Sequence, residues 1–279
     1  MNKRLDCAGK LLDLSLPQVM GILNTTPDSF SDGGVFFARD AAIDRAWQMF
    51  REGAAIIDVG GESTRPGAQP VSLQEELDRV IPVIEALHAE LPVVISIDTS
   101  KPEVMREAVR AGAGMINDVY ALRQEGAMAV AADCNVPVCL MHMKGEPRTM
   151  QKRPSYDDVV EEVKSFLLSR VEVCLEAGIR REQLLVDPGF GFGKTLQHNL
   201  QLLNRLPDIA ALELPVLVGI SRKSMLSVLL DERPVEGRLY GGIAAATVAL
   251  WQGASIVRVH DVAPTVDALK ITAAVKQIN

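Results

Sequence analysis

The sequence has few cysteines, and their spacing excludes the common structural zinc motifs. The four are Cys7, Cys134, Cys139 and Cys174. They form no CxxC pair, and none lies near a second cysteine and a histidine at zinc-finger spacing. We therefore expect free thiols in a reducing compartment, which predicts a cytoplasmic protein.

Long apolar runs and an export signal are also lacking. The longest apolar runs, such as residues 243–251, are much shorter than the roughly 20 residues that span a bilayer. Residues 1–16 include Asp6 and Asp13 and hold no apolar segment followed by a small-residue cleavage site. We expect no membrane partner.

An excess of positive charge is absent as well. The formal net charge is -7, so the chain has no broad electrostatic attraction to nucleic acid or to anionic lipid. We expect no nucleic-acid partner. An anionic substrate would need a local basic site that acts against the overall charge.

The sequence does have the size and composition of a single large α/β domain. It contains 279 residues, of which 48% are hydrophobic and 23% charged. Hydrophobic residues at this level can build a large core. No linker, low-complexity segment or shift in composition divides the chain, so we predict one domain over residues 1–279.

Short apolar runs alternate with amphipathic stretches along the whole chain. Eight strands are predicted, at 18–23, 55–59, 93–97, 115–116, 136–141, 184–186, 216–220 and 255–259. Helical periodicity fills the gaps, and Ser100 and Ser221 are predicted to cap the helices that follow them. Eightfold alternation of strand and helix predicts a (β/α)8 TIM barrel, with a doubly wound open sheet as the alternative.

Polar residues follow nearly every predicted strand, which is where a barrel carries its chemistry. They are Asn24, Gly60 to Arg65, Asp98, Asn117, His142, Asp187, Ser221 to Lys223, Arg258 and His260. Each residue alone could be structural; Asp98 could be a helix cap, and His142 could be a satisfied structural histidine. Such a set at one rim indicates an active site.

Three loops refine this prediction. Residues 24–34 and 60–67 are long, hydroxyl-rich loops that could act as lids or be plain connections. Residues 189–195 resemble a phosphate-binding P-loop but are one residue short, so we interpret them as a glycine loop passing close to a flat ligand. Arg258 and His260 alternate onto one side of their strand and, with Arg222 and Lys223, predict a basic pocket for an anion.

These motifs resemble the dihydropteroate synthase family over about residues 19–262. The resemblance rests on the segments 21–34, 58–67, 96–101, 116–118, 187–193, 221–224 and 258–261. Thr25 stands where the family often has a hydrophobic residue. The resemblance implies a barrel enzyme that joins 6-hydroxymethyl-7,8-dihydropterin diphosphate to p-aminobenzoate in folate synthesis. It also implies Mg2+, a homodimer, and sulfonamides as mimics of p-aminobenzoate.

The resemblance also implies a role for each matching residue. The catalytic residues would be Asp98, Lys223, Arg258 and His260. The pterin would be bound by Asp98, Asn117, Asp187 and Lys223, and the diphosphate by Asn24, Arg258 and His260, with Asn24 also a ligand of the metal. The residues in contact with p-aminobenzoate would be Phe30, Thr64, Arg65, Pro66, Phe192 and Ser224. The family mechanism is dissociative, with a pterin cation formed before the amine attacks. Such a mechanism needs no side-chain nucleophile, and no Ser/His/Asp or Cys/His pairing is evident from spacing.

Two other functions fit part of the pattern. A methyltetrahydrofolate-dependent methyltransferase on a pterin-binding barrel would share Asp98, Asn117 and Asp187, but would not need Arg258 and His260 in this form. A catalytically silent pterin sensor would not need intact lid loops. Release of diphosphate that requires both substrates and Mg2+ would separate these alternatives from the synthase.

Overall fold

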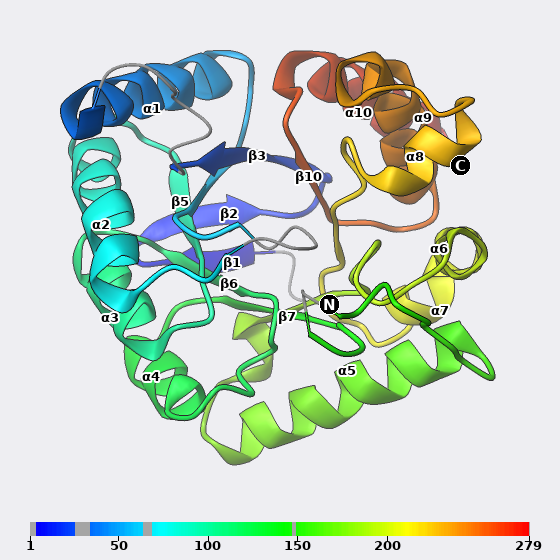
Figure 1. Cartoon of the computed structure of the whole chain (residues 1–279), viewed down its shortest axis with the longest axis horizontal. Helices are drawn as coiled ribbons and strands as arrows, with labels where there is room; N and C mark the ends of the chain where they lie inside the picture. Colours follow the sequence, from blue (N-terminus) through cyan, green and yellow to red (C-terminus); the bar gives the residue numbers. More distant parts are fainter. Residues whose placement is uncertain (1–3, 26–33, 64–68, 147–148, 279) are drawn as a thin grey trace.

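The structure is a barrel of parallel strands surrounded by helices (Figure 1). The computed structural model describes residues 4–25, 34–63, 69–146 and 149–278, with the backbone alone for 34–38. The barrel strands are β3 (Gln18–Asn24), β4 (Ile56–Gly60), β5 (Val94–Asp98), β6 (Met115–Asp118), β7 (Val138–Met141), β8 (Leu184–Asp187), β9 (Leu217–Val218) and β10 (Ile256–Val259). All eight strands predicted from the sequence are confirmed, to within a few residues at their ends.

The sheet is closed rather than open. The strands pair in parallel in the order β8-β7-β6-β5-β4-β3-β10-β9. A bridge between Val186 and Val216 links the two end strands, with the Val186 amide donating to the Pro215 carbonyl at 3.0 Å. This closure confirms the TIM barrel and excludes the doubly wound sheet.

Helices follow the strands and form the outer ring. They are α1 (Gly34–Arg51), α2 (Leu73–Glu90), α3 (Pro102–Arg110), α4 (Ala127–Cys134), α5 (Val159–Glu176), η2 (Arg181–Gln183), α6 (Leu196–Asn204), α7 (Leu206–Ala210), α8 (Ser224–Leu229), η3 (Val235–Arg238), α9 (Leu239–Trp251) and α10 (Val262–Lys276). Among the described residues, none of these helices combines the length and apolarity needed to cross a bilayer.

The two predicted serine caps are wrong. Lys101 and Lys223 occupy the N-cap positions of α3 and α8, and neither makes a side-chain cap. Ser100 instead donates to Asp118 at 2.5 Å, and the Ser221 hydroxyl lies 3.0 Å from the His260 ring. Both hydroxyls are drawn away from their helices by polar partners on neighbouring strand ends.

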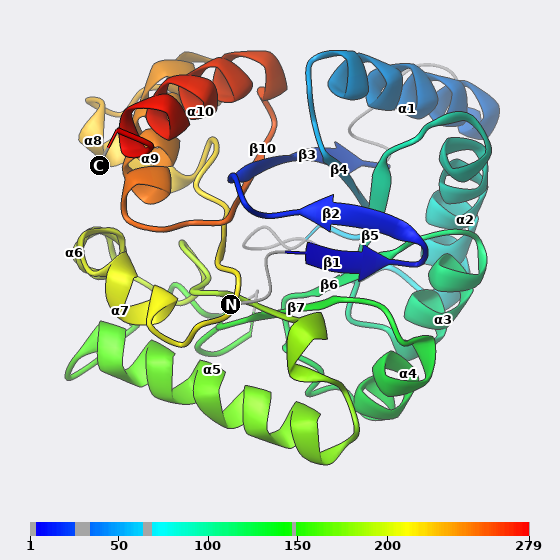
Figure 2. The same cartoon turned by 180° about the vertical axis from the view of Figure 1, so that it is seen from behind.

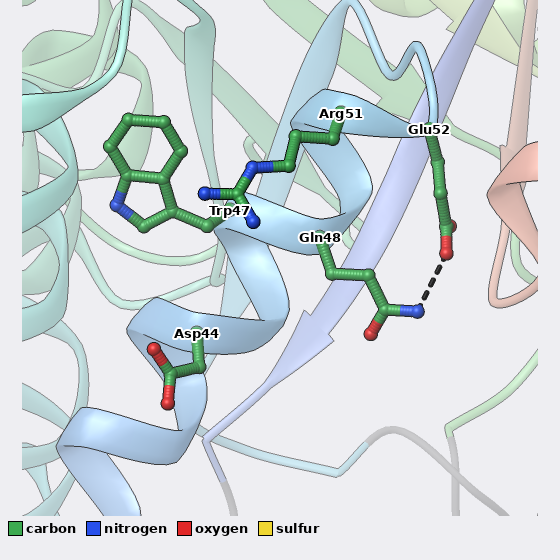
Figure 3. A pocket seen from close by; sticks show the side chains of 5 residues that line it. All are labelled: Asp44, Trp47, Gln48, Arg51 and Glu52. Carbon is green, nitrogen blue, oxygen red and sulfur yellow. Dashed lines mark hydrogen bonds between the residues drawn. The ribbon is translucent and has the colours of Figure 1, made fainter.

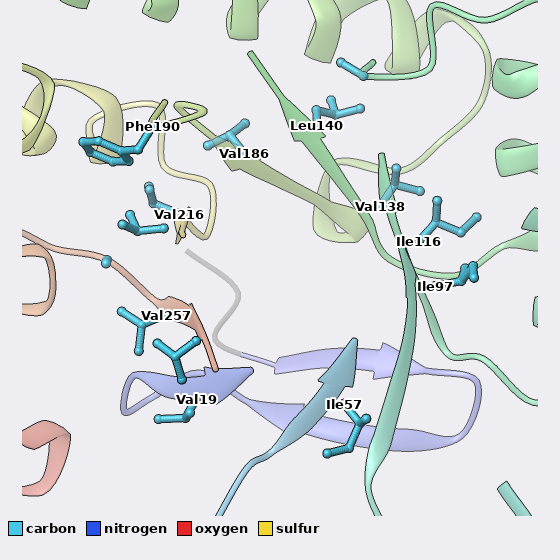
Figure 4. Close-up of a cluster of buried hydrophobic side chains, with 14 of the residues drawn as sticks. Val19, Ile57, Ile97, Ile116, Val138, Leu140, Val186, Phe190, Val216 and Val257 are labelled. Carbon is cyan, nitrogen blue, oxygen red and sulfur yellow. The ribbon is translucent and has the colours of Figure 1, made fainter. Parts of the chain in front are cut away.

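Most of the hydrophobic core lies in two layers, because side chains alternate across each strand. Outward-facing residues such as Ile57, Ile97 and Val186 pack against the helices (Figure 4). Inward-facing residues from all eight strands fill the lower part of the barrel; they are Met20, Ile56, Val94, Met115, Cys139, Leu185, Leu217 and Ile256. Polar residues therefore collect in the upper part, at the carboxyl ends of the strands.

A hairpin absent from the predicted elements covers the opposite end of the barrel. β1 (Arg4–Cys7) pairs with β2 (Lys10–Asp13) in antiparallel register, and Figure 2 shows the pair lying across the barrel. Its Leu5, Cys7 and Leu12 join the inner core layer. The Lys10 ammonium donates to two carbonyls just before β5, at 3.1 Å and 2.8 Å.

Candidate active site

The upper barrel layer brings together the polar residues that the strand-end pattern selected. Asp98, Asn117, Asp187 and Arg258 come from β5, β6, β8 and β10, and each faces the barrel interior. Asn117 and Asp187 are buried, and the Asp98 and Arg258 side chains are 11% and 20% exposed. Residues separated by up to 160 positions in the sequence therefore lie together at the carboxyl end of the barrel strands, which forms the mouth of the barrel.

Arg258 lies between two carboxylates. Its Nε donates to Asp58 Oδ2 and its Nη2 donates to Asp98 Oδ2, both at 2.6 Å. Asp58 Oδ2 also accepts from Asn117 Nδ2 at 3.1 Å. The four side chains form one hydrogen-bonded network across β4, β5, β6 and β10.

The pKa values of Asp98 and Arg258 are both raised in this network, for different reasons. Burial raises the pKa of Asp98 to about 7, against the lowering effect of the adjacent Arg258 charge. Burial alone would lower the pKa of Arg258, but Asp58 and Asp98 outweigh it and hold that pKa above its usual range. Arg258 therefore stays charged, whereas Asp98 gains or loses its proton near pH 7.

Asp187 and Lys223 form the other half of the mouth. Asp187 Oδ1 accepts from the Gly189 amide at 2.6 Å, which fixes one face of the carboxylate. The Lys223 ammonium donates to the Phe190 carbonyl and lies 4.6 Å from the Phe192 ring centroid. Burial lowers the pKa of Lys223 to about 8, although Asp187 counteracts it. Burial also raises the pKa of Asp187, with Lys223 as the largest opposing charge.

Lys194 holds the glycine loop that follows Asp187 in place by contacts to its backbone carbonyls. This side chain is 3% exposed, and its ammonium contacts the Gly189 and Phe192 carbonyls at 2.9 Å and 3.1 Å and His142 Nδ1 at 2.9 Å. A Cβ on Gly189, whose φ is +69°, would meet a carbonyl oxygen at 1.9 Å. The lysine points into the protein, which supports rejecting the P-loop interpretation, and His142 lies in the interior.

His260 is held beside the mouth by Ser221. The Ser221 hydroxyl lies 3.0 Å from His260 Nδ1 and accepts from the His260 amide at 3.2 Å. Sequence spacing indicated no serine–histidine pair, because these residues stand 39 positions apart. Both contacts orient the imidazole.

The predicted basic pocket needs a correction, because its cations are paired with acids. Arg222 has φ +60° and turns to Asp261, its Nη2 lying 2.6 Å from Oδ1. Arg258 and Lys223 likewise face Asp58, Asp98 and Asp187. Positive and negative groups alternate around the mouth.

Comparison with known proteins identifies the family. The sequence model described as "Pterin binding enzyme" matches residues 20–260. The dihydropteroate synthase of Escherichia coli is 55% identical over 271 residues, 97% of this chain and 96% of that protein. A structure of Xanthomonas albilineans dihydropteroate synthase with 4-aminobenzoic acid matches with a TM-score of 0.95 at 53% identity, covering 100% of both chains. The Xanthomonas albilineans enzyme in complex with 7,8-dihydropteroate matches with a TM-score of 0.91 at 51% identity, covering 99% of this chain and 100% of that one.

The chain belongs to the dihydropteroate synthase family. Every described residue to which the family resemblance gives a pterin role lies in the mouth. Of the residues expected on the p-aminobenzoate side, Phe192 and Ser224 lie next to Lys223, in space and in sequence respectively. The others, Phe30, Thr64, Arg65 and Pro66, lie outside the described residues, as do most of the two predicted lid loops.

The residue that the family resemblance places on Mg2+ is at the rim of the same mouth. Asn24 ends β3, and its Oδ1 lies beside Gly60, as does the Asp98 carboxylate. Among the described residues no cluster of three or more acidic, histidine or cysteine side chains could hold a metal by itself. A single amide oxygen fits Mg2+, which takes few protein ligands and completes its shell with water and substrate phosphate oxygens.

One of two surface hollows adjoins the mouth, and the other lies away from it. A cavity of about 600 Å³ adjoins Asp98 and is lined by residues of the loops after β4, β5 and β6, including Lys101 and Tyr120. A second hollow of about 550 Å³ lies over α1, between Trp47, Arg51 and Glu52 (Figure 3). The α1 hollow contains none of the mouth residues.

Sequence reasoning assigned no role to Asp58 or Lys194, although the structure buries both in contact with site residues or the glycine loop. Asp58 has a sequence signal, since it is a charged residue inside the apolar strand Ile56–Gly60. Lys194 has none, because a lysine before a helix normally predicts a solvated side chain. The contacts that bury Lys194 depend on the path of the glycine loop.

Proposed function

We propose that this barrel mouth joins 6-hydroxymethyl-7,8-dihydropterin diphosphate to p-aminobenzoate, giving 7,8-dihydropteroate and diphosphate in folate synthesis. The observation that carries the proposal is the meeting of Asp98, Asn117 and Asp187 with Arg258 and Lys223 at one barrel end. The acids and amides suit a flat heterocycle, and the cations suit an anionic leaving group. Membership of the dihydropteroate synthase family agrees with both.

The pterin would be recognised by its hydrogen-bonding edges. A pterin edge presents adjacent N–H donors in one plane, which a carboxylate accepts as a pair. Asp187 is placed for this, since one of its oxygens is already oriented by Gly189. Asn117 could donate and accept on another edge, and Lys223 could donate to a ring nitrogen or carbonyl.

The bond to the leaving diphosphate would break before the amine attacks. Arg258 and His260 would take up charge on the diphosphate as the carbon–oxygen bond lengthens. Asp98 would stabilise the positive charge that develops on the pterin. The Ser221–His260 contacts support a binding role for the imidazole, because they fix its orientation.

We further propose a role for Mg2+, with Asn24 as its protein ligand. Three carboxylates and two cations meet at the mouth, so these side chains alone supply no net positive charge for a diphosphate. When bound, Mg2+ would neutralise charge on the diphosphate oxygens.

We propose a homodimer in the cytoplasm as the working form. The helix predicted at 241–253 could have packed against a partner or against the barrel. In α9 the small residues Ala245, Ala246 and Ala249 pack inward, while Tyr240 and Trp251 point outward, Tyr240 with 76% exposure. An exposed aromatic pair supports a partner interface on this helix. All four cysteines are free, which suits a reducing compartment.

The proposal is tested by product formation and by pterin binding. The purified protein should form 7,8-dihydropteroate when both substrates and Mg2+ are present. Asp187→Asn should weaken pterin binding by roughly 2 kcal/mol in calorimetry, since a charged paired acceptor is lost. The exposed Asp133→Asn is the matched control and should bind normally. Unchanged pterin binding by Asp187→Asn, or no product from the unsubstituted protein, would contradict the proposal.

A further inference from the structure

Asp58 is a buried charge in the mouth that the proposed reaction does not yet use. It lies in the middle of β4, is 0% exposed, and has apolar strand neighbours on both sides. Burying a carboxylate costs several kcal/mol unless it is paired and hydrogen-bonded. A side chain needed for packing alone would not be an aspartate.

The contacts of Asp58 link the two halves of the substrate site. One oxygen, Oδ2, accepts from Arg258 Nε at 2.6 Å and from Asn117 Nδ2 at 3.1 Å. Among the described residues, the other oxygen has no hydrogen-bond partner. One carboxylate atom therefore contacts both the expected diphosphate-binding arginine and the expected pterin-binding amide.

These contacts restrict how Arg258 can sit. Nε is bonded to Asp58 and Nη2 to Asp98, so two donors on one side of the planar guanidinium are fixed by strands β4 and β5. A guanidinium has five N–H donors, so others remain to face an anion. Without Asp58, Asp98 alone would hold the group, and rotation about that single contact would move those donors.

We propose that Asp58 is a positioning residue, which holds Arg258 and Asn117 at a fixed spacing so that the diphosphate and the pterin ring are bound at the same time in the correct relative orientation. The inference rests on the proposed function. The donors on Arg258 would then be oriented before substrate arrives, which is the condition for stabilising charge as it develops. Asp58 acts through Arg258 and Asn117, and need not touch the substrate itself.

The first experiment is steady-state kinetics on Asp58→Asn, which keeps the shape and removes the charge. We expect kcat to fall roughly tenfold to a hundredfold, as for other small displacements of catalytic groups. Ser96→Ala is the matched control, because Ser96 pairs with Asp58 in register on β5 and its buried hydroxyl also lacks a partner among the described residues. Its kcat and KM should stay within about twofold of the unsubstituted values.

A double-mutant cycle separates positioning from a general structural role. If Asp58 acts through Arg258 as well as Asn117, adding Asp58→Asn to Arg258→Ala should cause a clearly smaller loss of kcat than Asp58→Asn causes alone. An equal loss in both backgrounds would overturn the proposal, and so would an Asp58→Asn enzyme with normal kcat. A failure of the proposed reaction would look different, because the unsubstituted protein would then make no product.

A measurement on the unsubstituted protein covers the case in which Asp58→Asn does not fold. In a nitrogen-15 NMR spectrum the Nε–H of Arg258, assigned with Arg258→Lys, should exchange slowly with water because it donates to a buried carboxylate. Exchange as fast as that of the exposed Arg110 would overturn the proposal.

Discussion

Burial brings the pKa values of Asp98 and Lys223 close to neutrality from opposite directions, and both side chains face the same mouth. Burial raises the pKa of Asp98 to about 7 and lowers the pKa of Lys223 to about 8. If the reaction uses ionised Asp98 and protonated Lys223, kcat/KM should rise through about pH 7 and fall above about pH 8. A pH profile of kcat/KM for the pterin substrate measures both limbs.

Substitutions assign the two limbs. Lys223→Arg should remove the fall at high pH, because a guanidinium stays charged there. Asp98→Asn should remove the rise near pH 7. If the rise stays in place in Asp98→Asn, it belongs to the substrate diphosphate and the prediction for Asp98 is wrong.

His142 should make the stability of the protein depend on pH. Burial, followed by the Lys194 charge, lowers the pKa of His142 to about 2. The unfolded chain binds a proton at His142 below about pH 6.5, whereas the folded chain does not. Unfolding therefore takes up a proton at His142, which contributes a fall in the free energy of unfolding of about 1.4 kcal/mol per pH unit below pH 6.5. Asp98, whose pKa burial raises to about 7, contributes a rise of similar slope as the pH falls from about 7 to about 4, so the two contributions oppose each other.

Urea unfolding at pH 7 and pH 5 checks this slope. His142→Asn should shift the slope by about 1.4 kcal/mol per pH unit toward greater stability at low pH, because asparagine does not titrate, even if stability at pH 7 is also lower. His88→Asn, at an exposed position on α2, should leave the slope as it was. Equal slopes in the unsubstituted protein and His142→Asn would rule out His142 as the source.

At the residue scale, the sequence was informative about which groups meet and uninformative about how they pair. The strand-end rule selected Asp98, Asn117, Asp187 and Arg258, because barrel topology alone sends their side chains to one end. The rule cannot say that Arg258 bridges Asp58 and Asp98, since that depends on the lengths of side chains across three strands. The basic pocket was overestimated for the same reason.

At the scale of elements, the buried strands were predictable and the N-terminal hairpin was not. The barrel strands are nearly continuous apolar runs, which is the pattern of strands covered on both faces. The strands of the hairpin are four residues each, and too few positions alternate to show a period. The caps at Ser100 and Ser221 failed because nearby polar groups compete for their hydroxyls.

The hairpin should stabilise the barrel without taking part in catalysis. Leu12 is 4% exposed in the inner core layer, whereas its neighbour Leu11 is 69% exposed. Leu12→Ala should lower the free energy of unfolding by about 2–4 kcal/mol. Leu11→Ala should change it by less than about 0.5 kcal/mol.

Kinetics on the same two variants separate the two ends of the barrel. Both should keep normal kcat/KM at a temperature where they are folded, because the mouth is at the opposite end. A loss of kcat/KM in folded Leu12→Ala would contradict this separation.

At the scale of the molecule, the α9 face should decide the oligomeric state. Trp251→Glu puts a charge on the exposed aromatic surface of α9, so it should convert a dimer to a monomer in sedimentation experiments. Leu168→Glu, at an exposed apolar position on α5 across the barrel, is the control and should leave the mass unchanged. A monomeric unsubstituted protein, or a dimeric Trp251→Glu, would contradict the proposed interface.

The place of the hairpin also has a consequence for biosynthesis. Leu5 and Leu12 leave the ribosome early, yet their inner-layer neighbours include Leu217 and Ile256, which are made late. At about 10 residues per second, the hairpin waits on the order of 25 seconds for its docking surface. A nascent chain therefore carries these leucines undocked until the last barrel strand is made, and chaperones that hold apolar segments should matter more for its yield than for its refolding from urea.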